Sequence, residues 1–304
     1  MSVSQRATPD PILGFYGPST QMWRINREAV LLGAGPAALL LQIAHPLVAE
    51  GVAQHSQFEA DPFARLRNTL MTTMDLVFGD GSTAERALRR LNGVHAAVKG
   101  QVTDAEAMRA SAGATAYRAM DPALLLWVQA TLIVTSVTAY QRWVGALTDH
   151  EKETFWQEAR RVGPRMGIPL DRSPASWPAL LAYWDSMLSS DGPIQVTPTA
   201  RRLAPMILRP PLPAVPGACV DILGLPGLGL LPPRIREDFG IAWSPRRERA
   251  ARLLGRTVKL WVRAVPPGWR AMPQARAAER RSRAATAGSI QSQRPTLQEP
   301  MRAA

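Results

Sequence analysis

The chain has 304 residues, of which 46% are hydrophobic and 20% are charged. This balance excludes an intrinsically disordered chain and supplies enough apolar side chains for a large core. The single cysteine, Cys219, excludes an intrachain disulfide, a cysteine-rich zinc site and a four-thiolate iron–sulfur cluster.

The formal net charge of +12 is unevenly distributed. Residues 1–233 carry 20 Lys and Arg against 19 Asp and Glu, whereas residues 234–304 carry 16 against 5. A basic C-terminal region can contact an anionic membrane surface, although such regions are also common in Arg-rich chains. We expect no specific nucleic-acid partner, and we keep peripheral membrane contact as a hypothesis. The first residues, MSVSQRATPDPILGFYG, lack the core of a signal peptide, so we expect a cytoplasmic protein.

The first part of the chain has helical patterns. Residues 20–60 are apolar on most sides and contain Pro36 and Pro46, which predict two short helices or one kinked helix. A second helix is predicted to begin at Asp61-Pro62, with the aspartate as N-cap, and to run to about Phe78, where Gly79 stops it.

A third helix is predicted over residues 83–100. Apolar residues and His95 fall on one face of this helix at i, i+3 and i+4 spacing, so His95 is expected to point inward.

Residues 122–147 (PALLLWVQATLIVTSVTAYQRWVGAL) form the longest apolar stretch. It is uncharged from Pro122 through Gln141, which is long enough to cross a membrane. Polar side chains such as Gln129 dilute it, and the sequence shows no second span. We therefore predict the buried central helix of a large bundle.

The C-terminal half continues the helical pattern. Further helices are predicted over residues 149–166, 176–190, 198–208 and 244–264. The Pro- and Gly-rich residues 209–233 are expected to wrap the body as an irregular packed segment, and the chain beyond Pro273 has the composition of a disordered end. Alternating strand patterns are essentially absent, so we predict an all-α protein.

Histidine-dependent chemistry has four candidates, His45, His55, His95 and His150. His150 lies in the charged segment TDHEKE and is expected to face solvent. His45, Glu50 and His55 supply the residue types of a two-histidine, one-carboxylate site for non-haem iron. Their spacing is not i, i+4 and a proline intervenes, which favours packing or hydrogen-bonding roles.

His95 has small neighbours, which would let a macrocycle approach the helix closely. A neutral imidazole is the usual proximal ligand of haem iron. A core histidine satisfied by ordinary hydrogen bonds would give the same local pattern, so the residues alone leave both interpretations open.

Arg65 and Thr69 are spaced i, i+4 and share one face of the second predicted helix, with Asn68 one step round. An arginine there is either a surface charge or a buried donor to an anion such as a haem propionate. The spacing alone does not identify the anion.

Several motifs in order resemble the family of MpaB-type oxygenases and rubber-oxygenase catalytic domains. They are Trp23…Arg27, GPAALLLQIAHPLVAEGVAQHSQF (35–58), DPFARLRNT (61–69), VFG (77–79), VHAAVKG (94–100), YRAMDPALLLWVQATL (117–132) and AYQRWVGAL (139–147). The resemblance runs from about residue 15 to residue 265. It implies one domain over residues 15–265, and the composition of the remaining residues, 266–304, predicts a basic, disordered tail.

The resemblance implies a single large helical bundle with a globin-like core that holds haem b. His95 matches the proximal iron ligand of that family, and Arg65 and Thr69 match an arginine and a threonine that support the haem or its distal pocket. Characterised rubber-cleaving members use O₂ to split carbon–carbon double bonds.

Three departures limit what is carried over. Asn68 stands where rubber-cleaving members have a lysine, and Gln129 stands where many relatives have a histidine. Glu50 is near the position of a proposed catalytic glutamate but is not equated with it. We therefore predict a haem-b-dependent oxygenase acting with O₂ on an apolar, for example unsaturated, substrate. The alternatives are a non-catalytic haem- or lipophile-binding protein and a non-haem oxidoreductase using His45, Glu50 and His55.

Overall fold

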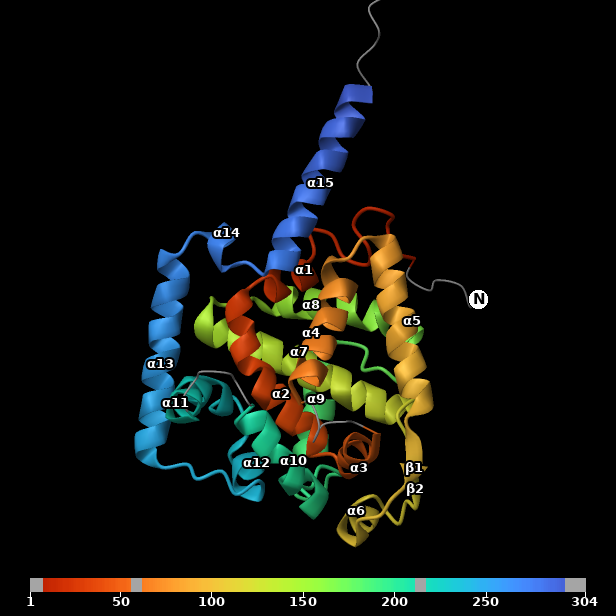
Figure 1. Cartoon of the computed structure of the whole chain (residues 1–304), viewed down its shortest axis with the longest axis vertical. Helices are drawn as coiled ribbons and strands as arrows, with labels where there is room; N and C mark the ends of the chain where they lie inside the picture. Colours follow the sequence, from red (N-terminus) through yellow and green to blue (C-terminus); the bar gives the residue numbers. More distant parts are fainter. Residues whose placement is uncertain (1–7, 56–61, 211–216, 293–304) are drawn as a thin grey trace, which may run out of the picture.

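Helices make up almost all regular structure in the computed structural model (Figure 1). The structure describes residues 8–55, 62–210 and 217–292, apart from the side chains of 62–68, 218 and 286–292. Within these ranges the only sheet is one two-stranded antiparallel pair, so the predicted all-α class is confirmed. The elements are α1 (Gln21–Asn26), η1 (Ala29–Ala34), α2 (Gly35–Ile43), α3 (Pro46–His55), α4 (Pro62–Phe78), α5 (Gly81–Ala97), β1 (Lys99–Gln101), α6 (Ala105–Ala110), β2 (Ala116–Arg118), α7 (Pro122–Trp143), α8 (Asp149–Val162), η2 (Gly163–Met166), α9 (Trp177–Leu188), α10 (Pro198–Leu208), α11 (Gly217–Leu228), α12 (Pro233–Asp238), α13 (Pro245–Ala264), α14 (Pro267–Arg270) and α15 (Pro273–Ser292).

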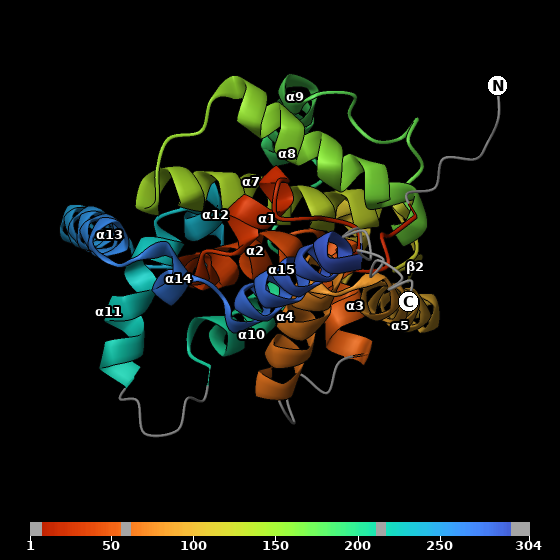
Figure 2. The same ribbon diagram turned by 90° about the horizontal axis from the view of Figure 1, so that it is seen from above.

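Helix α7 runs through the centre of the body, with α8 and α9 on one side of it and α2 and α4 on the other (Figure 2). Asp121 caps it by accepting the Ala123 N–H at 2.8 Å, and Pro122 occupies the first helical position. Its side chains enter two cores: Ile133 packs with α1, α5 and α8, whereas Trp127 packs with α2, α10 and α12. A helix buried on both sides needs apolar residues all round, which explains its composition.

The described residues contain one helix that is long and apolar enough to cross a membrane, and it is α7. The helices between Ala29 and His55 are apolar enough to make a second span only if they are taken together as one continuous segment. That segment bends by 105° between α2 and α3. In α7, 72% of the most apolar window is buried inside the body. This burial supports the prediction of a core helix.

The N-terminal helices follow the proline pattern. Pro36 lies in the first turn of α2 and Pro46 begins α3, which gives the predicted short helices with a sharp bend between them. Helix α4 ends at Phe78 as predicted, whereas the predicted N-cap Asp61 lies outside the described residues. Helix α5 ends at Ala97, three residues early, because Val98 adopts an extended conformation that leads into β1.

Two sequence expectations were wrong. Residues 217–228, expected to be irregular, form α11, which packs against α13 and α2. Gly227 permits close packing of α11 on η1 as well, since a Cβ at this position would lie 2.2 Å from the Gly33 carbonyl oxygen. The expected disordered tail instead forms α14 and α15 as far as Ser292, and residues 293–304 lie outside the description.

The first turns of α15 belong to the core. Ala275 and Ala278 are buried within the same cluster as α1 and α7. Arg281 donates hydrogen bonds to the carbonyl oxygens of Ile12 at 3.0 Å and Phe78 at 2.7 Å. The small alanines let this Arg-rich helix pack closely, a tertiary effect that composition alone does not reveal.

Candidate functional site

The residues predicted to contact haem lie on the α4–α5 hairpin, two antiparallel helices that stand side by side in Figure 1. Gly79 makes the tight connection, because a Cβ there would lie 2.3 Å from the Asp75 carbonyl oxygen. Asp80 caps the start of α5 through its side chain. On α5, Arg90 reaches back to the Asp75 carboxylate of α4 at 3.5 Å.

The short connection at Gly79 and Asp80 sets the levels of the two helices. Arg65 lies 14 residues before Gly79, and His95 lies 15 residues after Asp80. Since an α-helix rises 1.5 Å per residue, the backbone of each lies about 21–23 Å along the hairpin from the connection, so the two share a level. Thr69, whose side chain is exposed, lies one helical turn nearer the connection.

The side chains of Arg65 and Asn68 lie outside the described residues. Their backbone positions on α4 are therefore all that the structure contributes. Their roles at a haem stay predictions, as does the role of Thr69.

His95 lies in the last turn of α5 and is partly buried. Its Nδ1 atom is buried and has no hydrogen-bond partner among the described residues. Burial lowers the pKa of the imidazole, so the ring is neutral at neutral pH. A neutral imidazole with an unpaired nitrogen is in the state that binds a metal ion.

Asn92 adds a second unsatisfied atom to the same helix face. It lies three residues before His95, so the two side chains share one side of α5. Its Nδ2 donates to the Arg165 carbonyl oxygen at 2.8 Å, whereas its Oδ1 is buried without a partner among the described residues. A buried polar atom without a partner costs free energy, so two on one helix face indicate a place for a further polar group or ligand.

The end of α5 also leaves space. A Cβ added to Gly93 would meet nothing within 4 Å, and the side chain of Val94 is 57% exposed. By contrast, Ala84 and Leu88, near the start of α5, are buried in the core. Gly93 and Val94 lie about 200° and 100° round the helix from His95, so this open side is the solvent side of α5, whereas His95 lies on the side that carries Ala84 and Leu88.

His45 is buried in the bend between α2 and α3. Its Nδ1 accepts the Leu47 N–H at 3.3 Å. Burial lowers the pKa of His45 to about 4, and attraction to Asp121 opposes only part of this shift. The neutral ring therefore serves as a hydrogen-bond acceptor that shapes the bend.

Glu50 lies on α3 and is 1% exposed. Its Oε2 accepts hydrogen bonds from the Thr103 N–H at 2.9 Å, the Thr103 hydroxyl at 2.9 Å and Gln54 Nε2 at 3.0 Å. Gln54 also accepts the Tyr117 hydroxyl at 2.9 Å. We refer to Glu50, Gln54, Thr103 and Tyr117 as the Glu50 cluster. It attaches the β1–β2 pair and the segment before α6 to α3.

His55 lies at the exposed end of α3. Its Nε2 is 2.9 Å from the Lys99 carbonyl oxygen, and its ring meets Tyr117 edge to face. In the part of the chain that the structure describes, no three His, Cys, Asp or Glu side chains come together to hold a metal ion. The alternative prediction of an iron site at His45, Glu50 and His55 is therefore wrong, because each of these side chains makes its own separate contacts.

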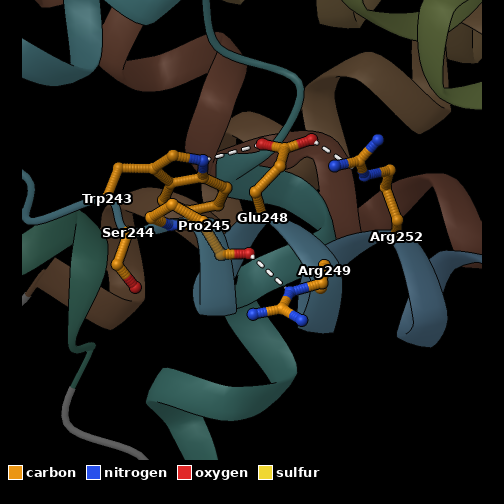
Figure 3. A pocket seen from close by; sticks show the side chains of 6 residues that line it. All are labelled: Trp243, Ser244, Pro245, Glu248, Arg249 and Arg252. Atoms are coloured by element: carbon orange, nitrogen blue, oxygen red, sulfur yellow. Dashed lines mark hydrogen bonds and ion pairs between the residues drawn. The ribbon is translucent and has the colours of Figure 1, made fainter.

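A shallow surface depression lies at the start of α13, away from these residues (Figure 3). Glu248 forms one wall, where its carboxylate accepts Trp243 Nε1 at 2.8 Å and pairs with Arg252 at 3.3 Å. Arg249 donates to the Pro245 carbonyl oxygen at 3.2 Å. None of the predicted site residues lines this depression.

Sequence reasoning missed Asn92 and the Glu50 cluster. Asn92 could have been found, because a polar residue three positions before His95 must share its face. Thr103 and Tyr117 could not, because the pairing of β1 with β2 brings them to α3, and a strand of three residues is too short to be recognised from its sequence.

The sequence pattern of one protein family matches residues 22–260, described as ER-bound oxygenase mpaB/B′ and rubber oxygenase, catalytic domain. Two similar proteins are Mb2261 of Mycobacterium bovis and Rv2237 of Mycobacterium tuberculosis, each 28% identical over 240 residues. The match covers 76% of this chain and 89% of each relative, and both relatives are described as uncharacterized. No solved structure matches. Because the family pattern spans most of the chain and includes the α4–α5 hairpin, the chain belongs to the mpaB/rubber-oxygenase catalytic-domain family.

Proposed function

We propose that this chain is a haem-b-dependent oxygenase that acts with O₂ on an apolar substrate, with His95 as the iron ligand. Membership of an oxygenase catalytic-domain family supports the reaction class. The observation that carries the haem assignment is the buried, unpartnered Nδ1 of a histidine kept neutral by burial. When bound, a haem supplies the redox chemistry with O₂.

The chain's own residues would hold and orient the ligands. His95 presents a neutral imidazole in the last turn of α5. Asn92 offers an unused acceptor on the same face. Arg65 is proposed to pair with a carboxylate of the haem, for which its planar fork is suited, and Thr69 is proposed to contact the same pocket.

The test is the visible absorption spectrum of the protein expressed with haem supply. We expect a Soret band that is lost or strongly shifted in His95→Ala. The matched control is His150→Ala, which removes an exposed histidine on α8 and should leave the band unchanged. Absence of the band in the unmodified protein, or an unchanged band in His95→Ala, would overturn the haem assignment.

A haem- or lipophile-binding protein without turnover is the second candidate. The observation that favours it is Asn68, which stands where rubber-cleaving relatives carry a lysine and which bears no charge. Oxygen consumption with apolar alkenes separates the two, since an oxygenase consumes O₂ in proportion to substrate. A stable haem complex that consumes no O₂ across such substrates would favour the carrier.

A further inference from the structure

The outward face of α13 combines exposed apolar side chains with arginines. Leu253, Leu260 and Trp261 are 64%, 65% and 52% exposed. They are spaced by seven and eight residues and therefore share one face of the helix. The opposite face, with Ala251 and Val262, is buried against the body. Helix α13 thus has two apolar faces: one is buried against the body, and the other is exposed to solvent.

Neighbouring helices extend this apolar face. Helix α11 packs against α13 and α14 follows α13, and the three helices lie on one side of the molecule (Figures 1 and 2). Helix α11 exposes two apolar side chains, and α14 exposes a tryptophan. We refer to this as the α13 surface; its apolar members are Ile222 (54% exposed), Leu223 (72%), Leu253, Leu260, Trp261 and Trp269 (82%). Among the described residues, Val94 is the only other large apolar side chain that is more than half exposed.

The charge of α13 is almost all positive. Residues 245–264 contain seven basic side chains and one acidic side chain, Glu248. Within the described residues, only Arg252 among these cations pairs with a carboxylate, and Figure 3 shows Arg249 turned instead to a backbone carbonyl. Arg249, Arg256 and Arg263 recur at intervals of seven residues, so they line one edge of the apolar face.

We propose that the α13 surface docks on an anionic lipid bilayer. Leucine and tryptophan side chains would enter the boundary between headgroups and acyl chains, while the arginines remain at the level of the lipid phosphates. This is the arrangement of helices that lie in the plane of a membrane surface.

The positive charge of the α13 surface favours an anionic bilayer over a second copy of the chain as its binding partner. A symmetric dimer would place two equally cationic surfaces against each other, which costs electrostatic free energy. A nucleic acid would satisfy the arginines but would leave the leucines and tryptophans of the surface in water. An anionic bilayer satisfies both.

This places membrane contact on α11, α13 and α14 rather than on the extreme C-terminal residues. Helix α15 is anchored in the core by Ala275 and Ala278, so its start is not free to act as a separate tail.

The test is co-sedimentation of the full chain with vesicles of phosphatidylcholine, with or without phosphatidylglycerol. We expect binding to the anionic vesicles that weakens as salt is added, and little binding to the neutral ones. The variant Arg249→Gln/Arg256→Gln/Arg263→Gln should weaken binding about 100-fold, since each cation near an anionic surface contributes about 1 kcal/mol. The variant Leu253→Ser/Leu260→Ser/Trp261→Ser should weaken it at least about tenfold.

Matched controls change exposed side chains elsewhere. They are Arg109→Gln/Arg118→Gln/Arg172→Gln for charge and Leu132→Ser/Leu170→Ser for apolar area, and both should bind like the unmodified chain. Removal of residues 293–304 should also leave binding intact. These measurements need neither haem nor turnover, so they are independent of the proposed reaction.

Several results would overturn the proposal. One is equal partitioning to neutral and anionic vesicles, and another is unchanged binding in both α13 variants. Binding to double-stranded DNA that falls in the arginine variant but not in the apolar variant would assign the surface to nucleic acid. A dimer in gel filtration that the apolar variant dissociates would assign it to a second copy of the chain.

Discussion

The end of α5 and the Glu50 cluster both contain residues that sequence reasoning nominated as iron ligands, yet their environments are opposite. In the Glu50 cluster one carboxylate oxygen accepts three hydrogen bonds, and Gln54 bridges it to Tyr117. On α5, His95 and Asn92 each keep a buried polar atom without a partner among the described residues. The first region is built to hold backbone together, whereas the second is left available for a ligand.

The comparison shows why residue type alone is a poor guide to a site. Histidines and carboxylates serve equally well as structural acceptors and as ligands. What distinguishes them here is whether the fold already satisfies their polar atoms. The following predictions test this contrast, beginning with the largest expected effect.

Glu50→Ala should destabilise the protein most, because it leaves the N–H and the hydroxyl of Thr103 without their buried acceptor. We expect the free energy of unfolding to fall by about 3 kcal/mol, measured by urea denaturation. Glu237→Ala removes an exposed carboxylate on α12 and should have little effect. If the two variants are equally stable, the Glu50 cluster is not the support described above.

Acidification should destabilise the protein through His45. Its pKa is about 4 in the folded chain and about 6.5 when unfolded, so the unfolded state binds more protons between these values. Stability is fully present above pH 6.5 and falls as the pH is lowered toward 4, with a loss of about 2 kcal/mol by pH 5. The lowered pKa of His95 adds in the same direction.

Urea denaturation at pH 7 and pH 5 measures this loss. His45→Asn keeps an acceptor for the Leu47 N–H but does not titrate, so it should flatten most of the dependence. A pH dependence that is unchanged in His45→Asn would contradict the assignment.

Two glycines offer a matched pair. In Gly100→Ala the new Cβ would lie 2.6 Å from the Tyr117 hydroxyl oxygen and 2.8 Å from Gln54 Oε1, so it should separate that hydrogen-bonded pair and cost about 1–3 kcal/mol. Gly93→Ala meets nothing and should stabilise α5 by up to about 1 kcal/mol. Thermal unfolding followed by circular dichroism compares them. Loss of stability in Gly93→Ala would show that this side of α5 is covered.

The smallest effect is expected for His95→Ala in the haem-free protein. Because Nδ1 has no partner among the described residues, its removal should change the free energy of unfolding by less than about 1 kcal/mol. Denaturation of haem-free protein measures this value separately from the spectrum. A loss as large as that of Glu50→Ala would erase the contrast between the two regions.

Local rules in the sequence determined most of the helices. Pro36 and Pro46 divide the N-terminal segment, Asp121 and Pro122 begin α7, and the uncharged composition of α7 predicted a central position. The inward face of His95 followed from helical periodicity, and the family followed from the order of its motifs. These features depend on residues close together in the chain, so the sequence displays them directly.

Tertiary structure decided the rest. Residues 217–228 are helical because α13 and α2 cover them, and α15 begins in the core because its alanines fit there. Whether Glu50, His45 and His55 make an iron site or a set of separate hydrogen bonds depended on which distant backbone groups reach them. The same holds for His95, because the groups packed around it decide whether its ring nitrogens are already hydrogen-bonded or can bind a ligand. A polar group's partners come from across the fold, so the sequence can nominate a ligand, but only packing shows that it is free to bind.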